Sequence, residues 1–136
     1  LLLGNTEYQR RGIRIEKKYA QDLPNLFAID DQMKQVFLNL LNNAKDACVE
    51  GGIISISTKV LGDKILIRIR DNGHGIHSED KDHIFEPFFT TKAETGGTGL
   101  GLSISSEIIS DHGGQISVEG AYGEGATFVV TLPVSN

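Results

Sequence analysis

The most informative stretch of the chain is residues 30–50, in which apolar residues recur every three or four positions. At about 100° per residue they cover one arc of a helix. These residues are Met33, Val36, Phe37, Leu40, Leu41, Ala44, Ala47 and Cys48. A second arc carries amides and a carboxylate, namely Gln35, Asn39, Asn43 and Asp46. The pattern predicts a long helix with a core face and a polar face. Asp30 or Asp31 would cap its start, and Gly51 and Gly52 would end it in a left-handed conformation.

Alternation of apolar and polar residues with a period of two predicts strands in much of the remaining chain. The predicted strands are residues 13–18, 26–29, 53–60, 64–70, 115–119 and 126–132. A glycine-containing turn at residues 61–63 has hairpin spacing. Helical spacing returns at residues 102–112, before a glycine pair, and a short helix is expected near residues 78–83. Because hairpins dominate and helices are interspersed, we expect an α/β two-layer sandwich, with a mixed sheet and its helices on one face.

Composition limits the kinds of protein this chain can be. With 136 residues, 39% of them hydrophobic, the chain can bury one core, so we expect one domain over residues 12–136, preceded at 1–11 by the end of a helix or a linker. The net charge of -5 argues against a nucleic-acid partner. The single cysteine, Cys48, cannot form an internal disulfide, which favours a reducing, cytoplasmic setting. No apolar run approaches the ~18 residues of a membrane span, so we expect no direct membrane contact by this domain, although a longer parent protein can be membrane-anchored.

The polar arc of the long helix raises the first functional question. Asn is a poor helix former, yet the helix contains Asn39, Asn42 and Asn43. Amide oxygens four residues apart project side by side and can bind a hard cation that phosphate oxygens also hold. The alternative is that these asparagines only cap neighbouring loops.

A second candidate site is Asp71-Asn72-Gly73-His74-Gly75, in which an acid at a strand end precedes two spaced glycines. Glycines let the backbone approach a flat ligand, and a carboxylate accepts a hydrogen bond from an exocyclic amine such as that of adenine. Guanine presents a carbonyl oxygen at the equivalent edge and would be rejected. An ordinary turn is the alternative.

The third candidate is the long, glycine-rich connection at residues 85–101, a composition typical of a binding loop or lid. Its glycines at 96, 97, 99 and 101 precede a helix, where free N–H groups can bind phosphate. The pattern is neither a Walker loop nor a Rossmann fingerprint. The alternative, a flexible hinge, is compatible with phosphate binding. Lys92 can place a positive charge over the outer phosphates.

Five motifs, in this order, resemble the conserved boxes of the catalytic, ATP-binding domain of sensor histidine kinases, which is part of the GHKL superfamily of ATPases and kinases. They are residues 39–44 (NLLNNA), 71–75 (DNGHG), 85–92 (FEPFFTTK), 97–102 (GTGLGL) and 123–128 (GEGATF). They resemble, in turn, the asparagine box, first glycine box, phenylalanine box, second glycine box and final glycine box. The resemblance covers about residues 10–134.

This resemblance implies a sheet of about five strands beneath three helices, with an ATP lid between the third helix and the long helix. Asn43 would be the principal magnesium ligand, with Asn39 beside it, and Asp71 would recognise adenine. Asn43 and Lys92 would act in catalysis. The other nucleotide-binding residues that it implies are Asp46, Gly73, Gly75, Ile76, Thr91, Gly97, Thr98, Gly99, Leu100, Gly101 and Thr127.

The chain departs from the family pattern at two positions. Asp46 stands where many members carry Lys, Arg or His for phosphate, so Lys92 is expected to carry more of that task. Ala126 stands where Ser or Thr is common, which leaves Thr127 as the side-chain hydroxyl of the final box.

The implied function is to bind Mg·ATP and to donate the γ-phosphate to a histidine on a separate dimerisation and phosphoacceptor domain of the same protein, which then passes it to a response regulator. None of the four histidines here is followed by the acidic residue typical of the acceptor histidine. Relatives that hydrolyse ATP carry a general-base Glu four residues before the key asparagine, and this chain has Asn39 there, an amide that cannot take a proton from water. A nucleotide-responsive protein-binding module and a hydrolysing ATPase of the same superfamily remain the alternatives.

Overall fold

The structure is a computed structural model, and it describes residues 12–18, 30–48, 51–87, 101–120 and 122–134. Its elements, in chain order, are β1 (Arg14–Lys18), α2 (Asp30–Ala47), β2 (Ile53–Leu61), β3 (Lys64–Asp71), α3 (Ser78–Lys81), α4 (Gly101–Asp111), β4 (Gln115–Glu119) and β5 (Ala126–Pro133). The strand predicted at residues 26–29, the segment 1–11 and most of the predicted lid lie outside the described residues.

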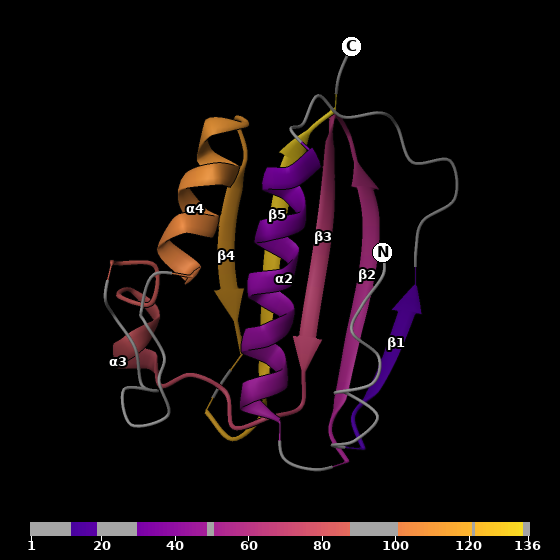
Figure 1. Ribbon diagram of the computed structural model, residues 1–136, viewed down its shortest axis with the longest axis vertical. Coiled ribbons are helices and arrows are strands. Elements are labelled where there is room, and N and C mark those ends of the chain that lie inside the picture. Colours follow the sequence, from indigo (N-terminus) through magenta and orange to yellow (C-terminus); the bar gives the residue numbers. More distant parts are fainter. Residues whose placement is uncertain (1–11, 19–29, 49–50, 88–100, 121, 135–136) are drawn as a thin grey trace.

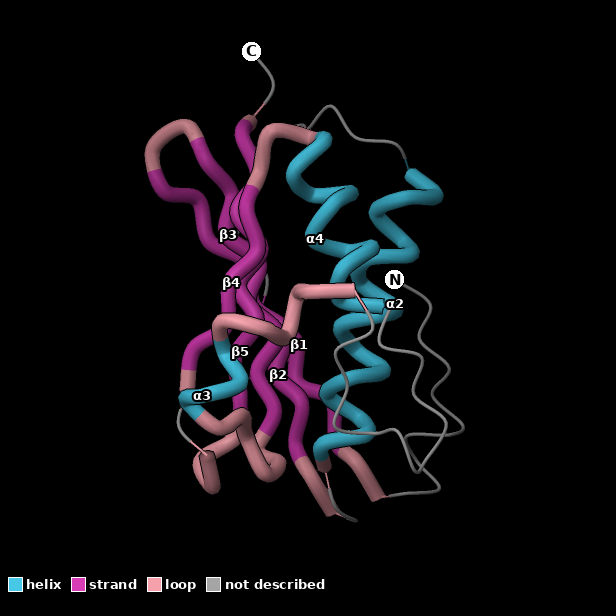
Figure 2. The backbone as a smooth tube through the Cα atoms, turned by 90° about the vertical axis from the view of Figure 1, so that its left-hand side faces the viewer, coloured by secondary structure: helices cyan, strands magenta, loops and turns pink. Residues whose placement is uncertain are grey.

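The five described strands form one mixed sheet in the order β1-β2-β3-β5-β4. β1 is parallel to β2, and every other neighbouring pair is antiparallel. Helices α2 and α4 lie side by side across one face (Figure 1), and Figure 2 shows them as a layer separate from the strands. The short helix α3 lies beyond the β4 edge of the sheet (Figure 1). The expected two-layer α/β fold is therefore confirmed.

The core lies between α2, α4 and the sheet, and its α2 side is the apolar arc that periodicity predicts. Val36, Leu40, Leu41 and Ala44 are at most 1% exposed. In the sheet, Ile69 pairs with Ile56 on one side and Phe128 on the other, and all three are buried. Because side chains alternate along a strand, this register places Asp71 on the same face as Ile69, beneath the helices.

Helix α2 ends earlier than its sequence suggests. Its last residue is Ala47, and the Cys48 N–H is shared between the carbonyls of Ala44 (3.1 Å) and Lys45 (3.2 Å). The carbonyl of Ala47 accepts a hydrogen bond from the N–H of His74 at 3.3 Å. A segment distant in sequence thus meets the helix end, whereas Gly51 (φ +80°) belongs to the turn before β2.

The start of α2 also differs slightly from expectation, because Asp30 and Asp31 are its first two residues rather than preceding it. In that position the exposed Asp31 still complements the positive end of the helix dipole. The C-terminus of α4 matches expectation: Gly113 adopts φ +77°, and the Gly114 N–H donates to the carbonyl of Ile109 at 2.9 Å.

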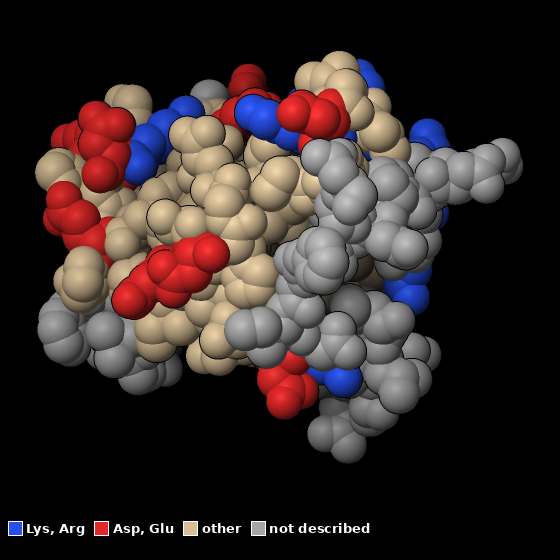
Figure 3. Space-filling model, turned by 90° about the horizontal axis from the view of Figure 1, so that it is seen from above, with Lys and Arg blue, Asp and Glu red and all other residues tan. Residues whose placement is uncertain are grey.

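Charged side chains of both signs are mixed on the described surface. Figure 3 shows Lys and Arg beside Asp and Glu along one margin, with a largely uncharged area next to them. Among the described helices, none is long and apolar enough to cross a membrane.

Candidate functional site

Asp71 is the last residue of β3, a strand whose arrow points to the lower end of the sheet in Figure 1, and only 2% of the residue is exposed. Its neighbours across the sheet are Ile54 and Ala126, both buried. The Oδ1 atom accepts a hydrogen bond from the N–H of Gly73 at 2.9 Å. Burial raises the pKa of Asp71 above its ordinary value of 3.8, while hydrogen bonds from the Gly73 and Ala126 backbone and the nearby His74 oppose that rise.

The loop after Asp71 packs directly against the end of α2. A Cβ added at Gly73 would overlap the carbonyl oxygen of Ala47, so no residue with a side chain fits there without a shift. Gly75 is buried and has φ +75°, a conformation that L-residues rarely adopt. The need for glycine at Gly73 therefore comes from the approach to α2.

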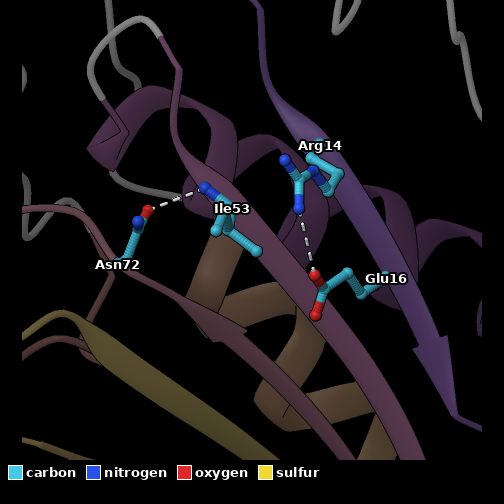
Figure 4. A network of polar contacts seen from close by, with 4 residues as sticks. All are labelled: Arg14, Glu16, Ile53 and Asn72. Atoms are coloured by element: carbon cyan, nitrogen blue, oxygen red, sulfur yellow. Dashed lines mark hydrogen bonds and ion pairs between the residues drawn. The ribbon is translucent and has the colours of Figure 1, made fainter.

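Asn72 has a structural task that the motif did not reveal. Figure 4 shows its side chain directed at the backbone N–H of Ile53, which donates to Oδ1 at 2.8 Å. Its own N–H donates to the carbonyl of Ile53 at 3.2 Å. Asn72 thus joins the start of β2 to the end of β3. The Arg14–Glu16 pair in the same view is exposed at 3.7 Å, and such surface pairs stabilise little.

The loop between β4 and β5 supports the Asp71 loop from the other side. The Gly123 N–H donates to the carbonyl of His74 at 2.6 Å, and a Cβ at Gly125 (φ +83°) would overlap the carbonyl oxygen of Asp71. The exposed ring of Tyr122 stacks on His77, with 3.7 Å between ring centroids. The final glycine motif therefore acts here through close backbone packing.

Asn39 lies half-buried on α2 and contacts the first turn of α4. Its Nδ2 donates to the carbonyl of Gly101 and to Oγ of Ser105, each at 3.2 Å. The Ser105 hydroxyl donates to the same Gly101 carbonyl at 2.8 Å. Asn43, one turn further along α2, is also half-buried, whereas Asn42 is exposed.

The described site therefore combines the amide face of α2, the Asp71 loop and the start of α4. Ile76 packs against the core beside it, and Asp46 is exposed on α2. Sequence reasoning missed Ser105. This polar residue lies three positions before Ile108 and four before Ile109, on the apolar face of the helix, and that position could have identified it.

Thr127 does not join this set, and its prediction as a nucleotide contact is not supported. In the register, Thr127 pairs with Arg70, while Ala126 pairs with Asp71. Adjacent strand residues point to opposite faces, so Thr127 lies on the face away from the helices and Ala126 is the neighbour of Asp71.

The predicted residues of the lid, Thr91, Lys92, Gly97, Thr98, Gly99 and Leu100, lie outside the described residues. The segment that enters the lid is described. Phe85 packs edge-on against Phe128 of β5, with 6.3 Å between centroids, and Ile84 is buried. His83 lies 2.9 Å from Glu86, and this hydrogen bond raises the pKa of His83 above 6.5.

A family model described as "Histidine kinase-, DNA gyrase B-, and HSP90-like ATPase" matches residues 28–136. The chain belongs to this family. A solved catalytic domain of histidine kinase ThkA superposes with a TM-score of 0.85 at 35% identity, with 96% of this chain and 84% of that chain covered. The chain is thus the catalytic ATP-binding domain of a sensor histidine kinase.

Curated relatives of this kinase domain are much longer proteins. Sensor histidine kinase ZraS of Escherichia coli is 40% identical over 135 residues, which cover 99% of this chain and 29% of ZraS. Sporulation kinase E of Bacillus subtilis is 38% identical over 133 residues, 97% of this chain and 18% of that protein. The kinase domain therefore spans less than a third of the length of these relatives.

Two further solved structures that resemble the domain are complexes, one with a nucleotide analogue and one with a response regulator. Full-length ShkA in complex with AMPPNP has a TM-score of 0.86 at 28% identity, covering 96% of this chain and 27% of that one. ThkA in complex with the response regulator protein TrrA has a TM-score of 0.81 at 32% identity, covering 96% and 37%.

Proposed function

We propose that this domain binds Mg·ATP and donates the γ-phosphate to a histidine on a separate dimerisation and phosphoacceptor domain of the same protein, from which a response regulator receives it. The observation that carries the proposal is the buried Asp71 carboxyl, which lies beside the end of α2, the helix whose asparagine Asn39 contacts the start of α4. The AMPPNP complex of ShkA and the response-regulator complex of ThkA support the nucleotide and the partner, respectively.

Asp71 would recognise the adenine of ATP. Its carboxylate has acceptor capacity beyond the bond from Gly73, and it can accept a hydrogen bond from the exocyclic amine. Gly75, buried and with positive φ, would let the backbone approach the base, with Gly73 and Ile76 beside it. A guanine carbonyl in the same place would face the carboxylate acceptor to acceptor and be rejected.

The donor set on α2 fits a magnesium ion. Neutral amide oxygens are hard ligands that Mg²⁺ accepts together with phosphate oxygens. The Nδ2 of Asn39 is engaged with α4, so its Oδ1 remains as the acceptor arm, one turn from Asn43. We infer that Asn43 is the principal ligand with Asn39 beside it. The ion, when bound, supplies positive charge that offsets phosphate charge.

The start of α4 would meet the phosphates, because the first N–H groups of a helix have no partner within the helix. Gly101 is its first residue, and Gly97, Thr98, Gly99 and Leu100 would continue the contact along the lid. Asp46, in the last turn of α2, adds negative charge to this helix, so we assign the neutralisation of the outer phosphates to Lys92, with Thr91 beside it.

The structure favours phosphate transfer over hydrolysis at the position of Asn39. Its amide nitrogen donates both of its hydrogen bonds to α4 and has no basic site for a proton. A water molecule there is not activated, so ATP is retained until an acceptor histidine arrives. The hydrolysing ATPase and the nucleotide-responsive binding module are the two competing functions.

Labelling in trans tests the proposal. The domain is mixed with a dimeric helical domain that carries the acceptor histidine and with ATP radiolabelled at the γ-phosphate. We expect label on the helical domain only, and Asn43→Ala should abolish it by removing the magnesium ligand. Asn42→Ala is the matched control, since Asn42 is an exposed asparagine on the same helix and should leave labelling unchanged.

Each competing function has its own signature in this experiment. Label on the isolated domain, or steady phosphate release at the rate of a typical ATPase, would replace the kinase with a self-sufficient hydrolase. Tight ATP binding without label on any supplied histidine would favour the binding module. We further propose that residues 12–136 form the catalytic unit and act in the cytoplasm, whether or not the parent is membrane-anchored.

A further inference from the structure

Ser105 is a fully buried polar residue in the helix layer, with 0% of its surface exposed. It lies on the core side of α4, among Ile108 and Ile109. A hydroxyl in such a place is costly unless it is hydrogen-bonded. Its Oγ donates to the Gly101 carbonyl at 2.8 Å and accepts from Nδ2 of Asn39 at 3.2 Å. Both capacities of the hydroxyl are therefore used.

The same contacts determine which way the Asn39 amide is turned. A carbonyl oxygen can only accept, so the group of Asn39 that faces Gly101 must be the nitrogen. Its two N–H bonds reach the Gly101 carbonyl and Ser105 Oγ, each at 3.2 Å. Three groups thus form a closed set of hydrogen bonds, here called the Asn39–Ser105 clip, which joins the middle of α2 to the first turn of α4.

We propose that the Asn39–Ser105 clip sets the position of the first turn of α4, and that Ser105 is a positioning residue for the phosphate end of Mg·ATP. The consequence for the nucleotide rests on the proposed function, in which this turn meets the phosphates and Asn39 Oδ1 faces the ion. Gly101 is held by its carbonyl, and the first N–H groups of a helix have no partner within the helix and can bind a ligand.

Replacing Asn39 with aspartate distinguishes the clip from a role of Asn39 as a magnesium ligand alone. A carboxylate is at least as good a magnesium ligand as an amide, so Asn39→Asp should preserve binding if Asn39 acts only as a ligand. In the clip, however, aspartate has no N–H to offer and would place an acceptor against the Gly101 carbonyl. Asn39→Asp should then behave like Ser105→Ala rather than like wild type.

The first measurement uses the nucleotide-free chain. By NMR we expect the side-chain amide protons of Asn39 to exchange slowly in the wild type and about three- to tenfold faster in Ser105→Ala, the range for loss of one hydrogen bond. Ser110→Ala is the matched control, because Ser110 is exposed on the same helix. Equal exchange in all three proteins would overturn the clip.

The second measurement is calorimetric titration with Mg·ATP and with adenosine, which has no phosphate. We expect Ser105→Ala and Asn39→Asp each to weaken Mg·ATP binding about three- to tenfold and to leave adenosine binding within about twofold of wild type. Wild-type affinity for Mg·ATP in both variants would overturn the positioning role. If Ser105→Ala does not fold, as judged by circular dichroism, the half-buried Asn39→Asp decides the question.

The two measurements separate failure of the clip from failure of the proposed function. A wild-type chain that does not bind Mg·ATP would contradict the proposed function, and with it the effect of the clip on the nucleotide. The exchange of the Asn39 amide protons would still report whether the clip holds α4.

Discussion

The carboxyl group of Asp71 is subject to two opposing effects at the end of β3. Burial favours its neutral form, whereas hydrogen bonds from the N–H groups of Gly73 and Ala126 favour its charged form. Burial is the larger effect, so the pKa of Asp71 is raised. The balance between these two effects sets the pKa of Asp71. An adenine amine would add one more hydrogen-bond donor and so favour the charged form further.

Replacing Asp71 with asparagine should weaken ATP binding about 10- to 100-fold. Hydrogen bonds to a charged group are worth about 1.5–3 kcal/mol, and an amide can turn its own donor toward the adenine amine. Calorimetry with ATP and GTP measures the effect, and Asp63→Asn at the exposed β2–β3 turn is the matched control. Normal ATP binding by Asp71→Asn, or wild-type binding of GTP as tight as that of ATP, would contradict adenine recognition by Asp71.

As the pH is lowered, the affinity for adenine should fall at a higher pH than it would with an aspartate of ordinary pKa. Only the charged form is a full acceptor, so affinity should fall as the pH drops through the raised pKa of Asp71, at a pH above 3.8.

The stability of the folded state responds to pH in the opposite sense. Because the pKa is raised on folding, the contribution of Asp71 to stability is complete below 3.8 and is lost as pH rises through the folded value.

Adenosine titrations at a series of pH values check this behaviour, because adenosine lacks the titrating phosphates of ATP. Asp71→Asn should show no such decline, since its amide does not titrate. A wild-type profile that parallels the variant would show that Asp71 does not set the pH dependence.

Among the elements, the contact between α2 and the loop after β3 holds the parts of the site together. Gly73 lies against the carbonyl of Ala47, and the N–H of His74 satisfies that carbonyl. The last turn of a helix leaves its carbonyls without partners inside the helix. The loop that carries the proposed adenine-binding residues thus also satisfies a carbonyl at the end of the helix that carries the asparagines.

Gly73→Ala should therefore destabilise the fold by about 1–3 kcal/mol, the usual cost of forcing extra atoms into a packed site. Urea denaturation measures the change in the free energy of unfolding. Gly101→Ala is the steric control, because its added Cβ would come no nearer than 3.7 Å to Asn39. If Gly73→Ala unfolded at the same midpoint urea concentration as the wild type, the close contact of the loop with α2 would be contradicted.

At the scale of the whole molecule, the site is assembled from parts that are far apart in sequence. The amides come from α2, the carboxyl from the end of β3 and the turn proposed to meet the phosphates from the start of α4. The packing of α2 against β3 holds the first two together, and the contact of α2 with α4 holds the third. A ligand that spans all three should therefore affect segments well beyond its own contacts.

Binding of Mg·ATP should lower the hydrogen-exchange rate of residues 88–99, the predicted lid between Phe85 and α4. Glycines and the lack of apolar anchors after Phe89 favour rapid exchange without nucleotide. Mass spectrometry of the free and nucleotide-bound chain makes the comparison, and the β2–β3 turn at residues 61–64 serves as an internal control. Strong protection of residues 88–99 before ATP is added would argue against a lid.

The kinds of element and their order follow from the sequence alone, because periodicity is a local property. The arc from Val36 to Cys48 specifies a helix with one buried face, and the alternation in residues 64–70 specifies a strand that delivers Asp71 at its end. The motifs are local as well, so the family and the candidate residues could be inferred before any contact was known.

The tertiary structure decided the properties that depend on contacts between segments far apart in the sequence. The carbonyl of Ala47, at the end of α2, accepts a hydrogen bond from His74 in the loop after β3, and nothing in residues 44–50 encodes that loop. Ala126 rather than Thr127 is the neighbour of Asp71 because the register between β3 and β5 pairs Ala126 with Asp71 and Thr127 with Arg70. The Asn39–Ser105 clip joins residues 66 positions apart, and a hydrogen bond over that separation exists only once the sheet has brought α2 and α4 side by side.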